Sequence, residues 1–274
     1  MAGRIAIGVD VGGCGVKCGA VDVATGQLVG SRRRVATPQP STPSAVVEVI
    51  ARLVERIGRD AGAPAAPVGV GIPSVVIGGV TRSAANIDAG WVAFDAGRAL
   101  TAAIGRPIIV LNDADAAGIA EMRFGAGKGV AGTVFVLTLG TGLGSALFND
   151  SVLVPNTELG HMEIRGRDAE RRSAAVARIR RGLSWKAWAG DLDEHLIAID
   201  RLFSPNLIVL GGGVSKNADR FLPYLTVRPP VVAAELRNDA GIVGAAMAAE
   251  EAAEATQLRP VRGASAACRT SPRR

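Results

Sequence analysis

One pattern occurs twice in the 274 residues of this chain: a strand-like apolar run, a glycine-containing turn and a second strand-like run. The first copy predicts strands at 5–10 and 16–22, and the second predicts strands at 133–139 and 145–148, about 128 residues later. Alternating helical and strand-like segments follow each copy. A repeat of this kind favours a duplicated α/β architecture, with two lobes and a cleft between them.

The remaining segments fit this reading. Strand-like runs are expected at 28–35, 68–72, 108–111 and 207–210. Helices are expected at 42–58, 95–104, 112–124, 168–181, 184–203, from about Ser215, and at 238–253. We therefore expect four regions, namely an N-terminal lobe (1–111), a C-terminal lobe (112–237), a final helix returning to the N-terminal lobe (238–254) and a basic disordered tail (255–274).

Charge is concentrated at one end of the chain. The formal net charge is +6, and the tail at 255–274 holds five Arg and no acidic residue, which leaves a nearly neutral body. With only 4% aromatic residues, the composition does not indicate a nucleic-acid-binding face. Apolar runs are shorter than a membrane span needs, so we expect no membrane partner. Three Cys form no disulfide framework, which favours the cytoplasm.

The first glycine turn follows a carboxylate at a strand end. Gly12 and Gly13 suit a tight hairpin, which is the purely structural interpretation. In the functional interpretation, unobstructed backbone N–H groups hold a phosphate. Asp10 would then hold Mg²⁺, through water, because Mg²⁺ prefers to keep its water shell.

Two further glycine turns extend this hypothesis. Gly140, Thr141 and Gly142 repeat the turn in the second half, which suggests a phosphate held from both sides. The third turn, 211–213, precedes a helix and offers a helix N-terminus to an anion, although it also fits a helix-entry loop capped by Ser215. The P-loop pattern is absent, and the one G-x-G-x-x-G precedes a strand, so a Rossmann site is excluded.

Polar residues gather at two other places. Asn112 and Asp113 follow a strand and open a helix, which fits either an N-cap with a first-turn acid or a carboxylate fixed in a cleft. Glu158 and His161 lie in a glycine-interrupted loop and suit hydrogen bonds to sugar hydroxyls. A zinc site there is disfavoured because Cys ligands are lacking and one His is too few. His195 lies beside an apolar stripe, and we interpret it as structural.

Together these residues resemble the ROK sugar kinases of the actin-like ATPase superfamily, over about residues 4–250. Within that family the chain is most similar to bacterial members that phosphorylate glucose with inorganic polyphosphate. The resemblance rests on a combination of motifs: Asp10-Val-Gly-Gly-Cys-Gly-Val-Lys17, Thr37-Pro-Gln-Pro40, Ala85-Asn-Ile-Asp-Ala-Gly-Trp91, Leu111-Asn-Asp-Ala-Asp-Ala-Ala-Gly118, Ala120-Glu-Met-Arg-Phe-Gly-Ala-Gly127, Gly140-Thr-Gly-Leu-Gly-Ser145, Val154-Pro-Asn-Thr-Glu-Leu-Gly-His161, Phe203-Ser-Pro-Asn206, Gly211-Gly-Gly-Val-Ser-Lys216 and Asn238-Asp-Ala-Gly-Ile-Val-Gly244.

The resemblance implies two ribonuclease-H-like lobes that close on the substrate, usually in a homodimer, and phosphorylation of glucose at its 6-hydroxyl by polyphosphate or ATP. It implies that Asp113 is the general base and that Asp10 assists Mg²⁺. The remaining implied roles are sugar binding by Asn86, Asn112, Glu158 and His161, phosphate binding by Gly12, Gly13, Cys14, Lys17, Gly140, Thr141 and Gly142, and nucleotide binding by Gly211, Gly212, Gly213 and Lys216.

The sequence departs from the family pattern at three points. Cys14 stands where Thr is usual, Ser74 stands where Gly is usual, and the C-x-C-G-x-x-G-C zinc motif is absent, as it is in polyphosphate-using members. The alternatives are an ATP-only ROK hexokinase, a polyphosphatase and a sugar-binding pseudo-kinase or regulator. A polyphosphatase would not need the sugar-binding set. ROK repressors carry a DNA-binding segment ahead of the kinase-like part, and with a first strand from about Arg4 we expect none here.

Overall fold

The first half of the chain forms a mixed five-stranded sheet. The structure, a computed structural model, describes residues 4–84 and 87–257. The strand order is β3-β2-β1-β4-β7, with an antiparallel meander followed by two parallel strands. The strands are β1 (Ile5–Gly12), β2 (Gly15–Asp22), β3 (Gln27–Val35), β4 (Val68–Ile72) and β7 (Ile108–Asn112).

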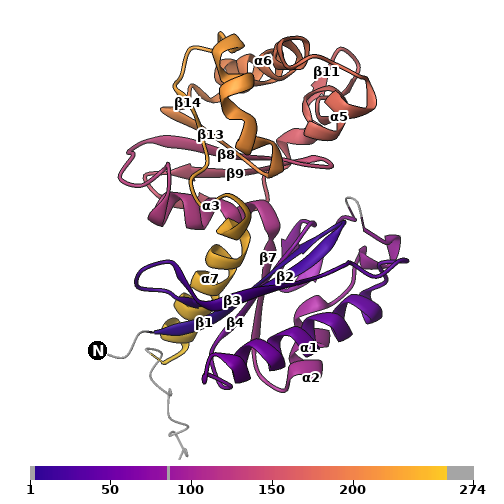
Figure 1. Cartoon of the computed structure of the whole chain (residues 1–274), viewed down its shortest axis with the longest axis vertical. Coiled ribbons are helices and arrows are strands. Elements are labelled where there is room, and N and C mark those ends of the chain that lie inside the picture. Colours follow the sequence, from indigo (N-terminus) through magenta and orange to yellow (C-terminus); the bar gives the residue numbers. More distant parts are fainter. Residues whose placement is uncertain (1–3, 85–86, 258–274) are drawn as a thin grey trace, which may run out of the picture.

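The second half forms a sheet with the same design. Its order is β10-β9-β8-β13-β14, again an antiparallel meander followed by two parallel strands. The strands are β8 (Thr133–Leu139), β9 (Leu143–Asn149), β10 (Val152–Val154), β13 (Leu207–Gly211) and β14 (Val231–Ala233). The duplicated α/β architecture predicted from the repeat is therefore confirmed, and Figure 1 shows the two sheets one above the other.

Helices cover the outer face of each sheet. On the first sheet, α1 (Pro43–Asp60) and α2 (Ala96–Ile104) bury an apolar face that includes Ile50 and Leu100. Each such side chain stabilises the fold by about 1.5–3 kcal/mol relative to exposure. On the second sheet, α6 (Trp185–Phe203) packs Trp188 against a core around Phe135. The Ser184 side chain caps α6 by accepting a hydrogen bond from the Ala187 N–H.

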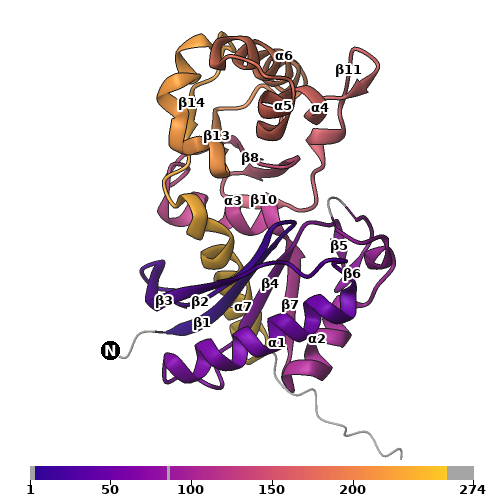
Figure 2. The same cartoon turned by 45° about the vertical axis from the view of Figure 1, so that its right-hand side comes forward.

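Two helices lie between the sheets, as Figure 2 shows. The final helix, α7 (Ala240–Gln257), packs on the inner face of the first sheet, and α3 (Asp113–Phe124) contacts both α7 and the second sheet. Close approach depends on glycine: a Cβ on Gly8 would collide with the Ile242 carbonyl, and one on Gly244 with the Ala116 carbonyl. The final helix thus returns to the first half of the chain.

Three local predictions were wrong. The single helix expected at 168–181 is two short helices, α4 (Glu170–Ser173) and α5 (Ala175–Arg180), because Ala174 between them is extended (ψ 151°). After the third glycine turn the chain forms a 3₁₀ helix, η3 (Gly213–Arg220). There Ser215 does not cap the helix, because its hydroxyl donates to the Gly212 carbonyl. Residues 255–257 belong to α7 instead of the tail, whose remainder lies outside the described residues.

Several short elements were not predicted because two or three residues show no periodicity. They are β5 (Val76–Ile77), β6 (Val80–Thr81), β11 (Glu163–Ile164), β12 (Arg167–Asp168), η1 (Ala89–Trp91), η2 (Leu159–His161), η4 (Leu222–Tyr224) and η5 (Arg237–Asp239). Within the described ranges, no helix combines the length and apolarity needed to cross a bilayer.

Candidate active site

A cavity of about 270 Å³ lies between the two halves, at the carboxyl ends of strands from both sheets. It brings together most of the residues predicted from sequence. These are Asp10, Gly12, Gly13, Lys17, Asn112, Asp113, Gly140, Thr141, Gly142, Glu158, His161, Gly211, Gly212 and Gly213. Cys14 is exposed at the tip of the first turn and does not line this cavity, and Lys216 lines an adjoining groove. Asn86 lies outside the described residues.

The glycine turns leave open space at the cavity. A Cβ built on Gly140 or Gly213 would meet no heavy atom within 4 Å, and neither residue has a positive φ. Neither packing nor backbone conformation therefore requires glycine at these two positions. Gly212 differs, because its φ is +80° and its backbone approaches Leu139 closely. Open space beside backbone N–H groups is what a bound phosphate needs.

Asp10 and Lys17 face each other across the first hairpin. They are register partners on β1 and β2, and the Lys17 Nζ lies 2.7 Å from Asp10 Oδ2. Gly241 at the start of α7 makes room for this carboxylate, since a Cβ there would lie 2.9 Å from Asp10 Cγ. A carboxylate at a cavity wall is the oxygen ligand that Mg²⁺ prefers, so Asp10 fits the predicted metal role. The ion pair also keeps the Lys17 ammonium at the wall.

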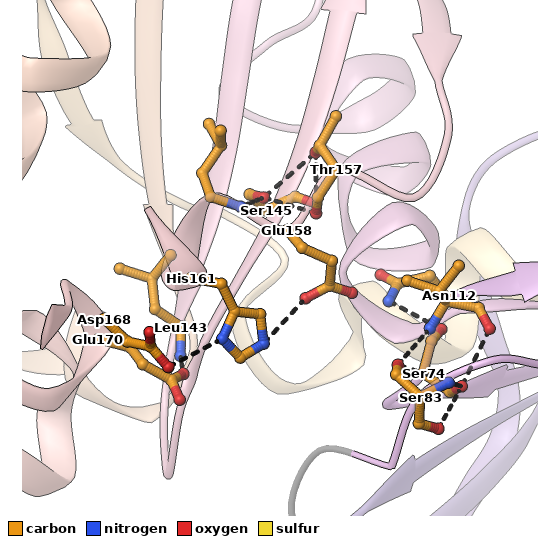
Figure 3. Close-up of polar contacts among 12 residues, drawn as sticks. Ser74, Ser83, Asn112, Leu143, Ser145, Thr157, Glu158, His161, Asp168 and Glu170 are labelled. Carbon is orange, nitrogen blue, oxygen red and sulfur yellow. Dashed lines mark hydrogen bonds and ion pairs between the residues drawn. The ribbon is translucent and has the colours of Figure 1, made fainter. Parts of the chain in front are cut away.

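Asn112 serves as the N-cap of α3. Its Oδ1 accepts hydrogen bonds from the N–H groups of Ala114 (2.8 Å) and Asp115 (3.0 Å), and its Nδ2 donates to the Ser74 carbonyl at 3.1 Å. Figure 3 shows the bond to Ser74. The cap interpretation of this residue is thus confirmed. One N–H of the amide remains for a ligand, because an amide has two donors.

Asp113 begins α3 and lies half-buried at the cavity wall. Burial, together with the negative charges of Asp10 and Glu158, raises the pKa of its carboxyl to about 7. The Ala114 N–H opposes this shift by donating to Asp113 Oδ1 at 2.9 Å. A carboxylate with a pKa near 7 can take up a proton at neutral pH, as a general base must.

Glu158 and His161 line the cavity from the second half of the chain and lie at the two ends of the short η2 helix. The His161 Nε2 lies 3.9 Å from Glu158 Oε2, and its Nδ1 lies 3.3 Å from Asp168 Oδ2, as Figure 3 shows. Burial raises the pKa of Glu158 above its usual value, which His161 opposes. Behind this loop, His195 is buried and contacts Ser173 and the Leu159 carbonyl, so its structural role is confirmed.

Two further carboxylates line the cavity and were not predicted. Glu121 is fully buried and accepts hydrogen bonds from the N–H groups of Ala126, Glu235 and Leu236, which ties α3 to the segment before α7. Glu170 accepts the Leu143 N–H at 2.9 Å. Only the motif at 120–127 signalled Glu121, because two of its three donors, the N–H groups of Glu235 and Leu236, are brought to it by the tertiary fold.

Two basic runs of the sequence, Arg32–Arg34 and Arg171–Arg181, supply four arginines that form ion pairs. Arg172 and Arg181 form ion pairs with acids of α6, and Arg32 and Arg33 pair with Asp239 and Asp60. By contrast, neither Lys216 nor Arg237 forms an ion pair with any described residue, and both line a groove that adjoins the cavity. The cationic surface nearest the site thus comes from different residues than the Arg171–Arg181 run.

Comparison with known proteins identifies the family. Residues 6–178 match the profile of the ROK family. The chain belongs to the ROK family. It is 47% identical over 246 residues to a polyphosphate glucokinase of Mycobacterium tuberculosis, a match that covers 89% of this chain and 91% of that protein.

Two solved structures resemble most of the chain. An inorganic polyphosphate/ATP-glucomannokinase from Arthrobacter sp. strain KM superposes with a TM-score of 0.88 at 52% identity, covering 91% of this chain and 99% of the other. A ROK family glucokinase from Streptomyces griseus, in complex with glucose and AMPPNP, has a TM-score of 0.78 at 27% identity, with coverage of 90% and 99%. The expected actin-like ATPase fold, with two ribonuclease-H-like lobes, is confirmed.

Proposed function

We propose that this chain is a kinase that transfers the terminal phosphoryl group of inorganic polyphosphate or ATP to the 6-hydroxyl of glucose. The proposal rests on one observation, the raised pKa of about 7 for the Asp113 carboxyl at the cavity. The same cavity is lined by the glycine turns, Glu158 and His161. Similarity to a polyphosphate glucokinase and to a polyphosphate/ATP-glucomannokinase supports the choice of donor and acceptor.

In this mechanism Asp113 accepts the proton of the 6-hydroxyl as the hydroxyl oxygen attacks the terminal phosphorus. The new bond joins that oxygen to phosphorus, and the bond from phosphorus to the rest of the donor breaks. Backbone N–H groups at Gly12–Gly13 and Thr141–Gly142, with the Lys17 ammonium, stabilise the negative charge on the transferred group, whereas the Gly140 N–H donates to the Gly142 carbonyl. The shortened polyphosphate or ADP leaves as the product.

The metal and the sugar use separate residues. Asp10 would hold Mg²⁺, which supplies positive charge to the phosphate oxygens. Glu158, His161 and the remaining N–H of Asn112 bind the sugar hydroxyls, and the family resemblance adds Asn86 to this set. Gly211–Gly213 and Lys216 contact the nucleotide when ATP is the donor. A homodimer and a cytoplasmic location complete the proposal, the first from the resemblance and the second from the low cysteine content.

One feature of the surface favours the use of polyphosphate over the use of ATP alone. The groove that adjoins the cavity carries Lys216 and Arg237 beside one acid, Glu235, and the Arg32–Asp239 ion pair. Its two cations, unpaired among the described residues, offer positive charge to a chain longer than a nucleoside triphosphate. A pseudo-kinase would bind sugar in the same cavity but would show no turnover.

The test is glucose 6-phosphate formation with polyphosphate and ATP in parallel, each with Mg²⁺. We expect turnover with polyphosphate at least as fast as with ATP. The matched control is Asp113→Asn, which keeps the size of the side chain and removes the proton acceptor. Turnover with ATP alone would establish an ATP-only hexokinase. No turnover with either donor, in a protein that binds glucose, would establish a pseudo-kinase.

A further inference from the structure

A closed ring of hydrogen bonds connects the acceptor side of the cavity across the two halves of the chain. Asn112 Nδ2 donates to the Ser74 carbonyl, and Asn112 Oδ1 accepts the Asp115 N–H. Asp115 Oδ2 in turn accepts the Asn156 N–H at 2.8 Å. The Val76 N–H donates to Asn156 Oδ1 at 2.8 Å, and the Val76 carbonyl accepts from Asn156 Nδ2 at 3.0 Å. The ring closes there because the backbone joins Val76 to Ser74, two residues earlier.

Asn156 is the member of this ring that joins the two halves. It lies in the loop between β10 and η2, whereas Val76 begins β5, in a hairpin attached to the first half. Its side-chain amide pairs with both backbone groups of Val76, as a neighbouring β-strand would. Its φ is +61°, a conformation that Asn tolerates far better than most residues. The residue type thus suits both the backbone and the contact.

The two ends of the ring lie beside the sugar-binding residues. Glu158 follows Asn156 by two positions, and Thr157 between them is held to Ser145 by hydrogen bonds in both directions. On the other side the ring includes the Asn112 cap, next to Asp113. Asp115 is only 2% exposed, so this contact is shielded from competing water.

From this geometry we propose that Asn156 is a positioning residue, which fixes Glu158 and His161 opposite Asn112 and Asp113 by clamping its loop to Val76. The assignment rests on the proposed sugar kinase function. Asn156 does not line the cavity. Its effect is therefore on the geometry of the acceptor side, while the glycine turns that bind the donor belong to other segments.

The test variant is Asn156→Gly, which tolerates the positive φ and keeps the backbone N–H bonded to Asp115, but removes both bonds to Val76. Asn156→Asp is a second variant, which keeps an acceptor for the Val76 N–H but places a carboxylate against the Val76 carbonyl. Ser151→Gly is the matched control, because Ser151 also has a positive φ (+66°) and is exposed in the turn between β9 and β10.

Two measurements on the full chain separate the clamp from the function. Hydrogen exchange at the Val76 amide tests the clamp without turnover, and we expect faster exchange in Asn156→Gly but not in Ser151→Gly. Steady-state kinetics test its role. Because each lost hydrogen bond changes an equilibrium by a factor of about two to ten, we expect the glucose KM to rise about tenfold, with the polyphosphate KM unchanged.

Three results would overturn the proposal. They are unchanged Val76 exchange in Asn156→Gly, faster exchange with an unaltered glucose KM, or equal increases in the glucose and polyphosphate KM values. Failure of the sugar kinase function itself is recognised separately, since the wild-type chain would then form no glucose 6-phosphate while its Val76 exchange still reports the clamp.

Discussion

The donor and acceptor sides of the cavity are built in different ways. The proposed donor side consists of glycine turns in which Gly140 and Gly213 leave open space, so we expect its ligand contacts to come from the backbone. The acceptor side consists of side chains that are already committed to the fold, as Asn112 is to the α3 cap and Asn156 is to Val76. A backbone site tolerates many phosphate donors, whereas a network of side chains fixes the geometry around one acceptor. The two sides should therefore respond separately to mutation.

Asp113 joins the two sides, and its loss should have the largest effect. Asp113→Ala should lower kcat by about 10²–10⁴-fold, the range that general base catalysis supplies. The helix should persist, because Asn112 still caps α3 through Ala114 and Asp115. Turnover measured beside the melting temperature separates catalysis from folding. A folded variant with near-normal kcat would remove Asp113 from the mechanism.

The donor side can be tested by filling its open space. Gly140→Ala should leave stability unchanged, because the added methyl group meets no protein atom, but should raise the polyphosphate KM about tenfold by reducing room for the phosphate. Gly190→Ala in α6 is the matched control, since Gly190 also has open space around it but lies outside the cavity. Unchanged donor kinetics in Gly140→Ala would contradict a phosphate site at this turn.

The charge of the adjoining groove should have a smaller effect. Changing Lys216 and Arg237 to Gln should raise the KM for long polyphosphate several-fold, because exposed charges act within a screening length of about 8 Å at physiological ionic strength. The dependence of that KM on added salt should also become shallower, with the glucose KM constant. Arg201→Gln is a control for loss of an exposed cation on α6. An equal effect in this control would refute a specific role for the groove.

The smallest effect concerns stability and pH. Burial raises the pKa of Asp115 from its usual 3.8 to about 7, so the folded state holds a proton that the unfolded state has lost. This contribution to stability is complete below pH 4 and is lost as the pH rises through 7. Between pH 5 and pH 8 the melting temperature of the wild type should therefore fall by a few degrees more than that of Asp115→Asn. Equal slopes would show that Asp115 is not protonated in this range.

The donor side was largely predictable from the sequence because it is local. A strand, a glycine turn and a second strand are encoded within one short segment, as at 5–22, and their repetition predicted the duplicated architecture of the two sheets. The Asn112 cap was also predictable, since it involves the next three residues. On the acceptor side, Glu158 and His161 came from a short motif and a family resemblance, and both line the cavity.

The rest was not predictable because it depends on residues that only the tertiary fold brings together. Asn156 and Val76 are 80 positions apart, and Glu121 bonds to an N–H 115 positions away. The partners of the basic runs were not predictable for the same reason, since the acid that pairs with both Arg172 and Arg181 lies on α6. The break at Ala174 depends on a single extended residue, which helical periodicity does not reveal.

The separation of the two sides is tested most directly by measuring both Michaelis constants in both variants. The glucose KM and the polyphosphate KM should be determined for the wild type, Gly140→Ala and Asn156→Gly under one set of conditions. The account predicts that Gly140→Ala raises only the polyphosphate KM and that Asn156→Gly raises only the glucose KM. If each variant raises both constants to the same extent, the cavity is a single coupled site and the account is contradicted.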